Sequence, residues 1–424
     1  MSEEFLQYIW QHKLFKHKEY ILDDGETVEI IDTGIKNTDS GPDFFNAKIK
    51  IGNTLWAGNI EIHKESSEWY SHGHNKDKAY NNVILHVVYK ISSGSINEKG
   101  NKVPVLKLEF SDSLLKNYTD LLRNKNGIFC KYQLEKIDNF YISFWLDKLA
   151  IERVNNKTDQ INSILNVNQN NWEESFYQYL CRSFGFGTNG NPFELLARSV
   201  SLKVLSKHKD NLNHIEAILF GQSGLLQLNE TNDEYTMLLN THYDHFKKKY
   251  GLKPIDGFIW KFMRLRPVNF PTVRIAQLSM LVFKSVHLLS KIKETKKLNQ
   301  LYELLKFGTS EYWKNHYHFS KESKTKEKII GNESIKSLVI NTIVPFLYIY
   351  GDKTGDEDLK TRSFNFLNEI SPERNNIIKE WELYGIYAGN AYESQALIQL
   401  RKEYCNKKKC IYCAIGNEII KSQK

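Results

Sequence analysis

The sequence predicts an α/β (α+β) N-terminal domain with a mixed sheet, followed by a mostly α-helical C-terminal domain. Two observations carry this prediction. Short apolar runs with period-2 alternation and turn signals continue to about residue 110, which is typical of strands. From Ser111 onwards, apolar residues recur at helical spacing. We place the boundary near residue 130, which gives domains 1–130 and 131–424.

Length and composition are typical of a soluble protein. The chain has 424 residues, enough for two cores, and is 41% hydrophobic and 25% charged. No apolar run approaches the ~18 residues of a membrane span, and the first residues, MSEEFLQYIWQHK, lack a signal-peptide pattern. We therefore expect a cytoplasmic protein without membrane association.

The charge balance favours an anionic partner. The formal net charge is +8, and short lysine runs occur at residues 247–249 and 407–409. Basic surfaces of this kind attract nucleic acid. The alternative is a solvated surface with a mild basic bias.

Local signals place the N-terminal elements in order. Apolar residues on one face predict an amphipathic helix over residues 3–15. Asp24-Gly25 predicts a first hairpin, and Gly52-Asn53 predicts a second between strands 44–51 and 55–64. Further strands are predicted at residues 83–89 and 103–110.

A carboxylate and an imidazole are expected on one strand face. Glu61 and His63 are two residues apart in strand 55–64, so they project to the same side. Asp43 comes directly before the partner strand. Two carboxylates can hold Mg²⁺ or Mn²⁺, and the basic group can activate a water. We therefore predict Asp43 and Glu61 as metal ligands, with His63 completing the catalytic group.

Histidines gather in the same region. Four of the chain's 13 histidines lie between residues 63 and 86. Gly73 separates two of them and suggests a broken turn there, while His86 lies in an apolar strand where a structural role is the alternative. Imidazole-rich ligation favours Zn²⁺ over Mg²⁺. A possible additional site therefore comprises His72, His74, Asp77 and His86.

The order helix, strand, hairpin, helix, strand, with Pro42-Asp43 and Glu61-Ile62-His63 at the hairpin, resembles the PD-(D/E)XK nuclease-like fold. The resemblance covers the first third of the chain and implies metal-dependent phosphodiester hydrolysis of nucleic acid. That family usually has a lysine where this chain has His63, and Lys64 faces the other way. An imidazole, neutral near pH 7, stabilises developing anionic charge less well than an ammonium group.

Two alternatives to a nuclease stay open. One is a catalytically inactive scaffold that binds nucleic acid without cutting it, because the lysine is missing. The other is a hydrolase acting on a non-nucleic substrate through a His/Asp metal site. The three hypotheses differ in metal preference and in whether cleavage follows binding.

A second resemblance extends over nearly the full length. The stretches GPDFFNAKIKI, GNIEIHKESSEW, VILHVVY and CIYCAIG resemble a family of uncharacterised bacterial proteins. This resemblance implies no particular function.

The helical region contains an arginine-rich turn. Arg264, Arg266, Asn269 and Arg274 fall within one segment that ends at a predicted helix start. Arginines on such a loop suit phosphate recognition, so we predict a nucleic-acid contact there. The alternative is that they tie two helices together through carbonyls and acids.

Three of the five cysteines cluster near the end of the sequence. Cys405, Cys410 and Cys413 have the spacing Cys-x4-Cys-x2-Cys, which suits zinc or an iron–sulfur cluster. The neighbouring lysines 407–409 are expected to favour thiolates. Cys130 is the expected fourth ligand, because some nucleases of the resembling fold combine one remote cysteine with a C-terminal group.

Overall fold

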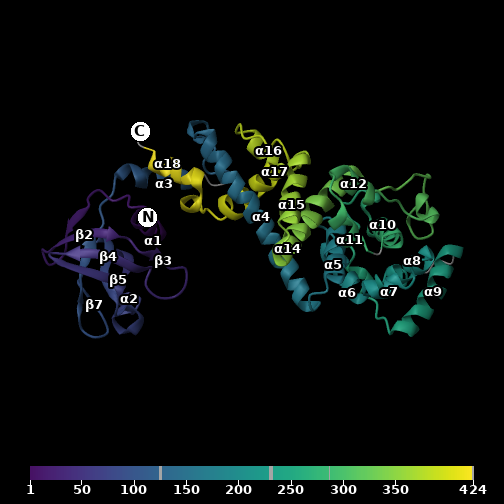
Figure 1. Ribbon diagram of the computed structural model, residues 1–424, viewed down its shortest axis with the longest axis horizontal. Helices are drawn as coiled ribbons and strands as arrows, with labels where there is room; N and C mark the ends of the chain where they lie inside the picture. Colours follow the sequence, from purple (N-terminus) through teal and green to yellow (C-terminus); the bar gives the residue numbers. More distant parts are fainter. Residues whose placement is uncertain (124–126, 229–232, 286, 423–424) are drawn as a thin grey trace. The chain divides into compact units, whose positions relative to one another are not determined.

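The computed structural model describes residues 1–123, 127–228, 233–285 and 287–422 (Figure 1). It divides into two compact units. The first comprises residues 1–145, 383–385 and 400–424, and the second comprises residues 146–382 and 386–399. This division differs from the predicted boundary at residue 130, because the chain returns to the first unit after residue 400.

The first unit is built on a seven-stranded mixed sheet in the order β1-β2-β4-β5-β6-β9, with β3 paired to β4. β5 and β6 pair in parallel, as do β6 and β9, and the other pairs are antiparallel. The predicted mixed sheet is therefore confirmed. Its strands are β1 (Glu19–Ile21), β2 (Thr27–Asp32), β3 (Ile35–Lys36), β4 (Phe44–Ile51), β5 (Thr54–Glu65), β6 (Val83–Lys90) and β9 (Val105–Lys107). A separate two-stranded sheet is formed by β7 (Ser95–Ile96) and β8 (Lys102–Val103).

Both predicted hairpins are present. Residues 24–25 lie in the turn between β1 and β2, and β4 turns into β5 at Gly52, which has φ +55°. A positive φ suits glycine because it has no Cβ. The β4–β5 register shifts between Phe44 and Ala47, where Asn46 also has a positive φ of 57°. This irregularity lies at the start of β4, directly after Asp43.

The amphipathic helix α1 (Glu3–Gln11) begins the chain, as predicted. Its apolar face, including Phe5 and Trp10, is fully buried, and the Trp10 indole donates to the carbonyl of Thr33 at 3.0 Å. Burying one aromatic side chain contributes roughly 1.5–3 kcal/mol. This packing therefore fixes the position of α1 and, with it, the positions of its polar side chains.

Between β5 and β6 the chain forms short helical turns rather than one helix. These are α2 (Glu68–Ser71), η1 (His74–Lys76) and η2 (Lys78–Tyr80). Gly73 separates the first two with φ +77°, in agreement with the expected break.

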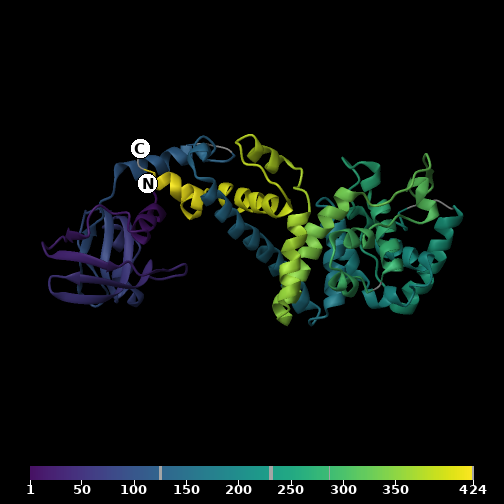
Figure 2. The ribbon, with the colours of Figure 1, turned by 45° about the horizontal axis from the view of Figure 1, so that its top comes forward.

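Two further segments complete the first unit. α3 (Asp112–Arg123) follows the sheet, and α18 (Ala414–Lys421) lies beside it (Figures 1 and 2). The Asn117 side-chain amide of α3 donates to the carbonyls of Ile420 and Ser422. The segment after residue 400 also contains η8 (Leu400–Cys405) and η9 (Cys410–Tyr412).

The second unit is mostly helical, which confirms the predicted helical region. α4 (Asn139–Val167) begins in the first unit and continues into the second. The remaining helices are α5 (Trp172–Phe184), α6 (Gly190–Ser199), α7 (Leu202–Ser206), α8 (Leu212–Gln222), α9 (Glu234–Tyr250), α10 (Pro271–Lys284), α11 (Leu288–Glu294), α12 (Leu298–Leu304), α13 (Asn332–Leu338), η7 (Val339–Ile343), α14 (Val344–Thr354), α15 (Glu357–Glu369), α16 (Asn376–Glu382) and α17 (Ala391–Gln399).

One helical stretch of the second unit is longer and more apolar than expected from the sequence. Residues 332–354 would cross a membrane by length and composition, and 72% of their most apolar window is buried inside the protein. Burial of this extent is also found in core helices of soluble proteins.

Candidate metal centre

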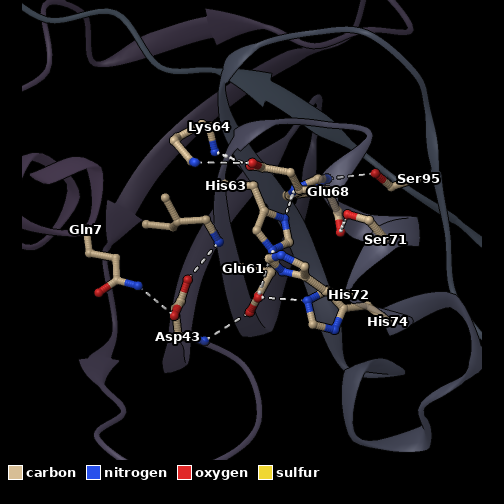
Figure 3. Close-up of polar contacts among 12 residues, drawn as sticks. Gln7, Asp43, Glu61, His63, Lys64, Glu68, Ser71, His72, His74 and Ser95 are labelled. Atoms are coloured by element: carbon tan, nitrogen blue, oxygen red, sulfur yellow. Dashed lines mark hydrogen bonds and ion pairs between the residues drawn. The ribbon is translucent and has the colours of Figure 1, made fainter. Parts of the chain in front are cut away.

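Asp43 and Glu61 meet where β4 begins and β5 runs past it (Figure 3). One Asp43 oxygen accepts from the Gln7 amide at 2.8 Å, and the other accepts from the Ile62 N–H at 3.0 Å. The Asp43 backbone N–H donates to Glu61 Oε2 at 3.1 Å. Both carboxylates are therefore fixed, and Glu61 Oε1 is left facing the histidines.

Three imidazoles converge beside this carboxylate, and two of them contact it. The ligand atoms of His63, His72 and His74 all lie within 4.8 Å of one another. His72 Nδ1 is 3.2 Å from His63 Nε2. Glu61 Oε1 lies 3.4 Å from His63 Nε2 and 3.2 Å from His74 Nε2. Three imidazole nitrogens therefore lie close enough to share one ion, and Glu61 Oε1 lies beside two of them (Figure 3).

The break at Gly73 makes this convergence possible. His72 ends α2 and His74 begins η1, so the left-handed glycine between them turns the chain back on itself. A continuous helix would direct residues two positions apart to different sides.

His86 lies behind His63. Its Nε2 is 2.8 Å from His63 Nδ1, and its Nδ1 is 2.7 Å from Ser95 Oγ. When His63 Nδ1–H donates to His86 Nε2 and His86 Nδ1–H donates to Ser95 Oγ, the lone pair of His63 Nε2 points into the cluster. A hydrogen bond on the far nitrogen sets the tautomer of a ligating histidine in this way.

Aromatic rings enclose the inner histidines. Tyr80 stacks on His74 with a centroid distance of 3.8 Å, and Trp69 contacts His74 edge-on at 5.4 Å. His63 is 2% exposed and His74 7%, whereas His72 is exposed. The cluster is therefore walled on its inner side and open to solvent at His72.

Burial shifts these acids and imidazoles towards their uncharged forms. Burial raises the pKa of Asp43 and of Glu61; the Glu61 carboxylate raises the pKa of Asp43 further, and the carboxylate of Glu3 raises both. Burial also lowers the pKa of His63 to about 2 and of His86 to about 3, aided by neighbouring imidazoles. His63 and His86 are therefore neutral near pH 7, and a bound cation would favour the ionised form of the two carboxyl groups.

One buried nitrogen of the cluster, His74 Nε2, makes no hydrogen bond within the described part of the chain. Glu61 Oε1 lies 3.2 Å from it. A buried polar atom without a partner is costly, and coordination of a metal would satisfy it. The donor set of imidazoles and a carboxylate is one that divalent transition metals bind.

Other predicted residues in this region are placed elsewhere. The Asp77 carboxylate is exposed and accepts from the Ala79 N–H, which caps η2. Lys64 Nζ lies 3.4 Å from Glu68, directed away from Asp43 (Figure 3). Neither side chain takes part in the convergence.

The arginine-rich segment does not form one surface. Arg274 is 6% exposed, its guanidinium donates to Asn269, Gln277 and Ser334, and it lies over the Phe186 ring at 4.3 Å. The predicted nucleic-acid contact through Arg274 is therefore corrected, because this side chain is buried in the second unit, whereas Asn269 is half-buried and its predicted role remains a prediction.

The other two arginines of that segment, Arg264 and Arg266, are exposed. Their role as nucleic-acid contacts remains a prediction.

Two residues near the site were not among the predicted ones. Gln7 orients Asp43, and Ser95 accepts the last contact of the series from His63 through His86. Nothing local to Gln7 or Ser95 indicated their partners, which are 36 and nine residues away.

Together, the fold and the site define a two-unit protein with a mixed-sheet unit, a helical unit and a buried histidine–carboxylate cluster. The chain belongs to the family described as "Protein of unknown function (DUF2851)", whose match covers residues 3–376. This confirms the resemblance to an uncharacterised family. No match was found among curated proteins or among solved structures.

Proposed function

We propose that this protein is a divalent-metal-dependent hydrolase that cleaves phosphodiester bonds in nucleic acid. The observation that carries the proposal is the convergence of three imidazole nitrogens, with Glu61 beside two of them and Asp43 next to Glu61. His63, His72, His74 and Glu61 would hold the metal, and Asp43 would support Glu61 through its backbone N–H.

The ligand set bears on which metal binds. Imidazoles favour Zn²⁺ and other transition metals, whereas Mg²⁺ prefers oxygen ligands. We therefore propose Zn²⁺ or Mn²⁺ in place of a Mg²⁺ site built on carboxylates alone. A bound divalent ion would supply an activated water and would stabilise anionic charge.

The residues have distinct roles in this proposal. Glu61 Oε1 would complete the ligand set beside His63 and His74, and the bound metal would lower the pKa of its water. His86 and Ser95 orient His63, and Gln7 orients Asp43. The exposed edge at His72 gives a substrate access.

The preference for an anionic substrate rests on charge. Lys76 in η1 and Lys78 in η2 are exposed and come two and four residues after His74, and the chain carries a net charge of +8. Lysines beside a metal site attract phosphates. We also propose, as part of the same hypothesis, that the first unit has a PD-(D/E)XK nuclease-like fold.

A second candidate is the same metal centre acting on a non-nucleic substrate. The abundance of imidazoles, and the absence of the expected lysine at residue 63, favour it. A nucleic-acid-binding scaffold without cleavage is the third, since Lys64 pairs with Glu68 and lies away from the site.

The test combines metal binding with cleavage. Titration calorimetry with Mg²⁺, Mn²⁺ and Zn²⁺, and incubation with single- and double-stranded DNA and RNA, would compare wild type with Glu61→Gln and His74→Ala. His17→Ala, at an exposed histidine of the same unit, is the matched control.

We expect both site variants to lose at least about 100-fold in metal affinity or cleavage, and the control to behave as wild type. Cleavage that Glu61→Gln leaves intact would overturn the proposal. Glu61-dependent metal binding without cleavage would select the second candidate, or the third if nucleic acid is still retained.

A further inference from the structure

The second unit contains a cavity of about 620 Å³, a volume within the range of roughly 300–1,000 Å³ that is typical of ligand pockets. Its lining residues come from the start of α9 and from the segment that contains η6 (Glu311–Lys314), β10 (His316–His318) and β11 (Lys321–Glu322). Three of these lining residues are acids, two are tyrosines, and the others are His316, Ser320 and Leu238. The cavity therefore combines negative charge with aromatic surface.

The aromatic wall of the cavity is a stack of three rings. Tyr312 lies between Tyr235 and His316, with a centroid distance of 3.9 Å on each side and interplanar angles of 16° and 3°. The Tyr235 hydroxyl donates to the fully buried carboxyl of Glu216 at 3.0 Å and accepts from the Trp313 indole at 3.0 Å. These contacts hold the rings in place before any ligand binds, which lowers the entropic cost of binding.

The first acid of the cavity, Asp233, is fixed against this wall. One Asp233 oxygen accepts from the Tyr312 hydroxyl at 2.8 Å and from the Ser320 hydroxyl at 2.5 Å, and the other accepts from the Thr236 N–H at 2.7 Å. Burial opposes the ionisation of Asp233, but these donors outweigh burial and lower its pKa. Asp233 is therefore a negatively charged group at neutral pH, held in one position.

The negative charge of the cavity has no cationic partner in its wall. The other two acids, Glu234 and Glu322, are exposed. Among the described residues, no lysine or arginine lines the cavity. Lys314 pairs with two acids outside the cavity, and Lys321 is exposed and is not a lining residue. A bound cation would supply the missing positive charge.

The arrangement of these groups indicates which kind of cation fits. A metal ion needs ligand atoms that converge, and in the part of the chain that the structure describes only the histidine trio brings three such atoms within 4.8 Å of one another. The acids of the cavity are therefore spread apart. An organic cation with ammonium groups joined by methylene chains can pair with separated carboxylates while its methylenes pack on the rings.

We propose that this cavity binds alkylammonium groups, supplied by a free polyamine or by the side chains of a lysine-rich peptide. Asp233, Glu234 and Glu322 pair with the ammonium groups, and the stacked rings of Tyr235, Tyr312 and His316 form the wall against which the alkyl chain packs. The proposal is independent of the hydrolase proposal, because the same three acids would repel the phosphates of a nucleic acid.

The test is calorimetric titration of the full chain with spermidine, a trivalent polyamine, at low ionic strength. We expect saturable binding of one spermidine per chain, and a loss of about 10-fold in affinity when Glu234→Gln and Glu322→Gln are combined. Glu369→Gln combined with Asp159→Asn is the matched control, because both residues are exposed acids of the second unit outside the cavity and the same number of charges is removed. Equal affinity of the two double variants, or binding that does not saturate, would overturn the proposal.

Two further ligands separate the sources of the cation. A blocked tri-lysine peptide carries the same charge as spermidine, so tighter binding of the peptide would support a protein partner and tighter binding of spermidine would support a free polyamine. Mg²⁺ that displaces spermidine with the same dependence on Glu234 and Glu322 would overturn the proposal in favour of a simple metal-ion site.

A measurement on the wild-type chain keeps the proposal testable if the variants misfold. Hydrogen–deuterium exchange with and without spermidine should show protection at residues 233–238 and 312–322, which line the cavity. Protection confined to other residues would place the binding elsewhere and overturn the assignment of this cavity.

Discussion

A single buried carboxyl in the second unit predicts how stability changes with pH. Glu216 is fully buried, and burial raises its pKa from 4.5 to about 7, although Ser310 and Tyr235 donate to it. Its protonated form is therefore favoured in the folded state. The stabilising contribution of this protonated carboxyl to the free energy of unfolding is fully present below pH 4.5 and is lost as the pH rises towards 7.

We expect Glu216→Gln, which mimics the protonated acid, to stabilise the second unit at pH 8 by up to about 3 kcal/mol and to be nearly neutral at pH 4. Urea unfolding at the two pH values measures this difference. An equal effect at both values would contradict the raised pKa of Glu216.

Ser95 is expected to act on the metal site through His86. Ser95→Ala removes the partner of His86 Nδ1, so the tautomer of His63 is no longer fixed. We expect metal affinity to fall by about 10-fold while the fold is retained. Calorimetric titration with Zn²⁺ measures the change, with Ser111→Ala at an exposed serine as the control. Equal Zn²⁺ affinity of the two variants would show that the contacts from Ser95 through His86 do not orient His63.

Among the elements, the turn between α2 and η1 decides whether His72 and His74 meet. Gly73 has φ +77° and no heavy atom near the position of a Cβ, so Gly73→Ala meets backbone strain and no clash. We expect a loss of about 1 kcal/mol and weaker metal binding. Gly94→Ala is the matched control, because Gly94 also has open space and no positive φ. Thermal melting and metal titration of the two variants would separate strain from a general effect of alanine.

At the scale of the whole molecule, two compact units predict two unfolding transitions. The histidine cluster lies entirely in the first unit and Glu216 in the second. Zn²⁺ at 100 times its Kd should stabilise only the first unit, by about 2.7 kcal/mol. Glu216→Gln should shift only the unfolding transition of the second unit. Calorimetry with and without Zn²⁺ measures this, and a single transition that moves with both changes would contradict two independent units.

The sequence by itself determined the features that depend on near neighbours. Turn signals placed the hairpins, because the φ preferences of glycine and asparagine act locally. Strand alternation put Glu61 and His63 on one side of β5, and the helical spacing after Ser111 predicted the helical region. Periodicity does not indicate α8, because residues 215–222 are all buried and its apolar residues show no single face.

Only the tertiary structure decided which distant groups meet. Parallel pairing of β5 with β6 brings His86 behind His63, and packing of α1 brings Gln7 to Asp43. The same holds for Arg274, which is enclosed by contacts from other helices although its sequence pattern suits a surface. Such contacts depend on how elements pack, and packing energy is shared among many residues far apart in the chain. No local pattern records it.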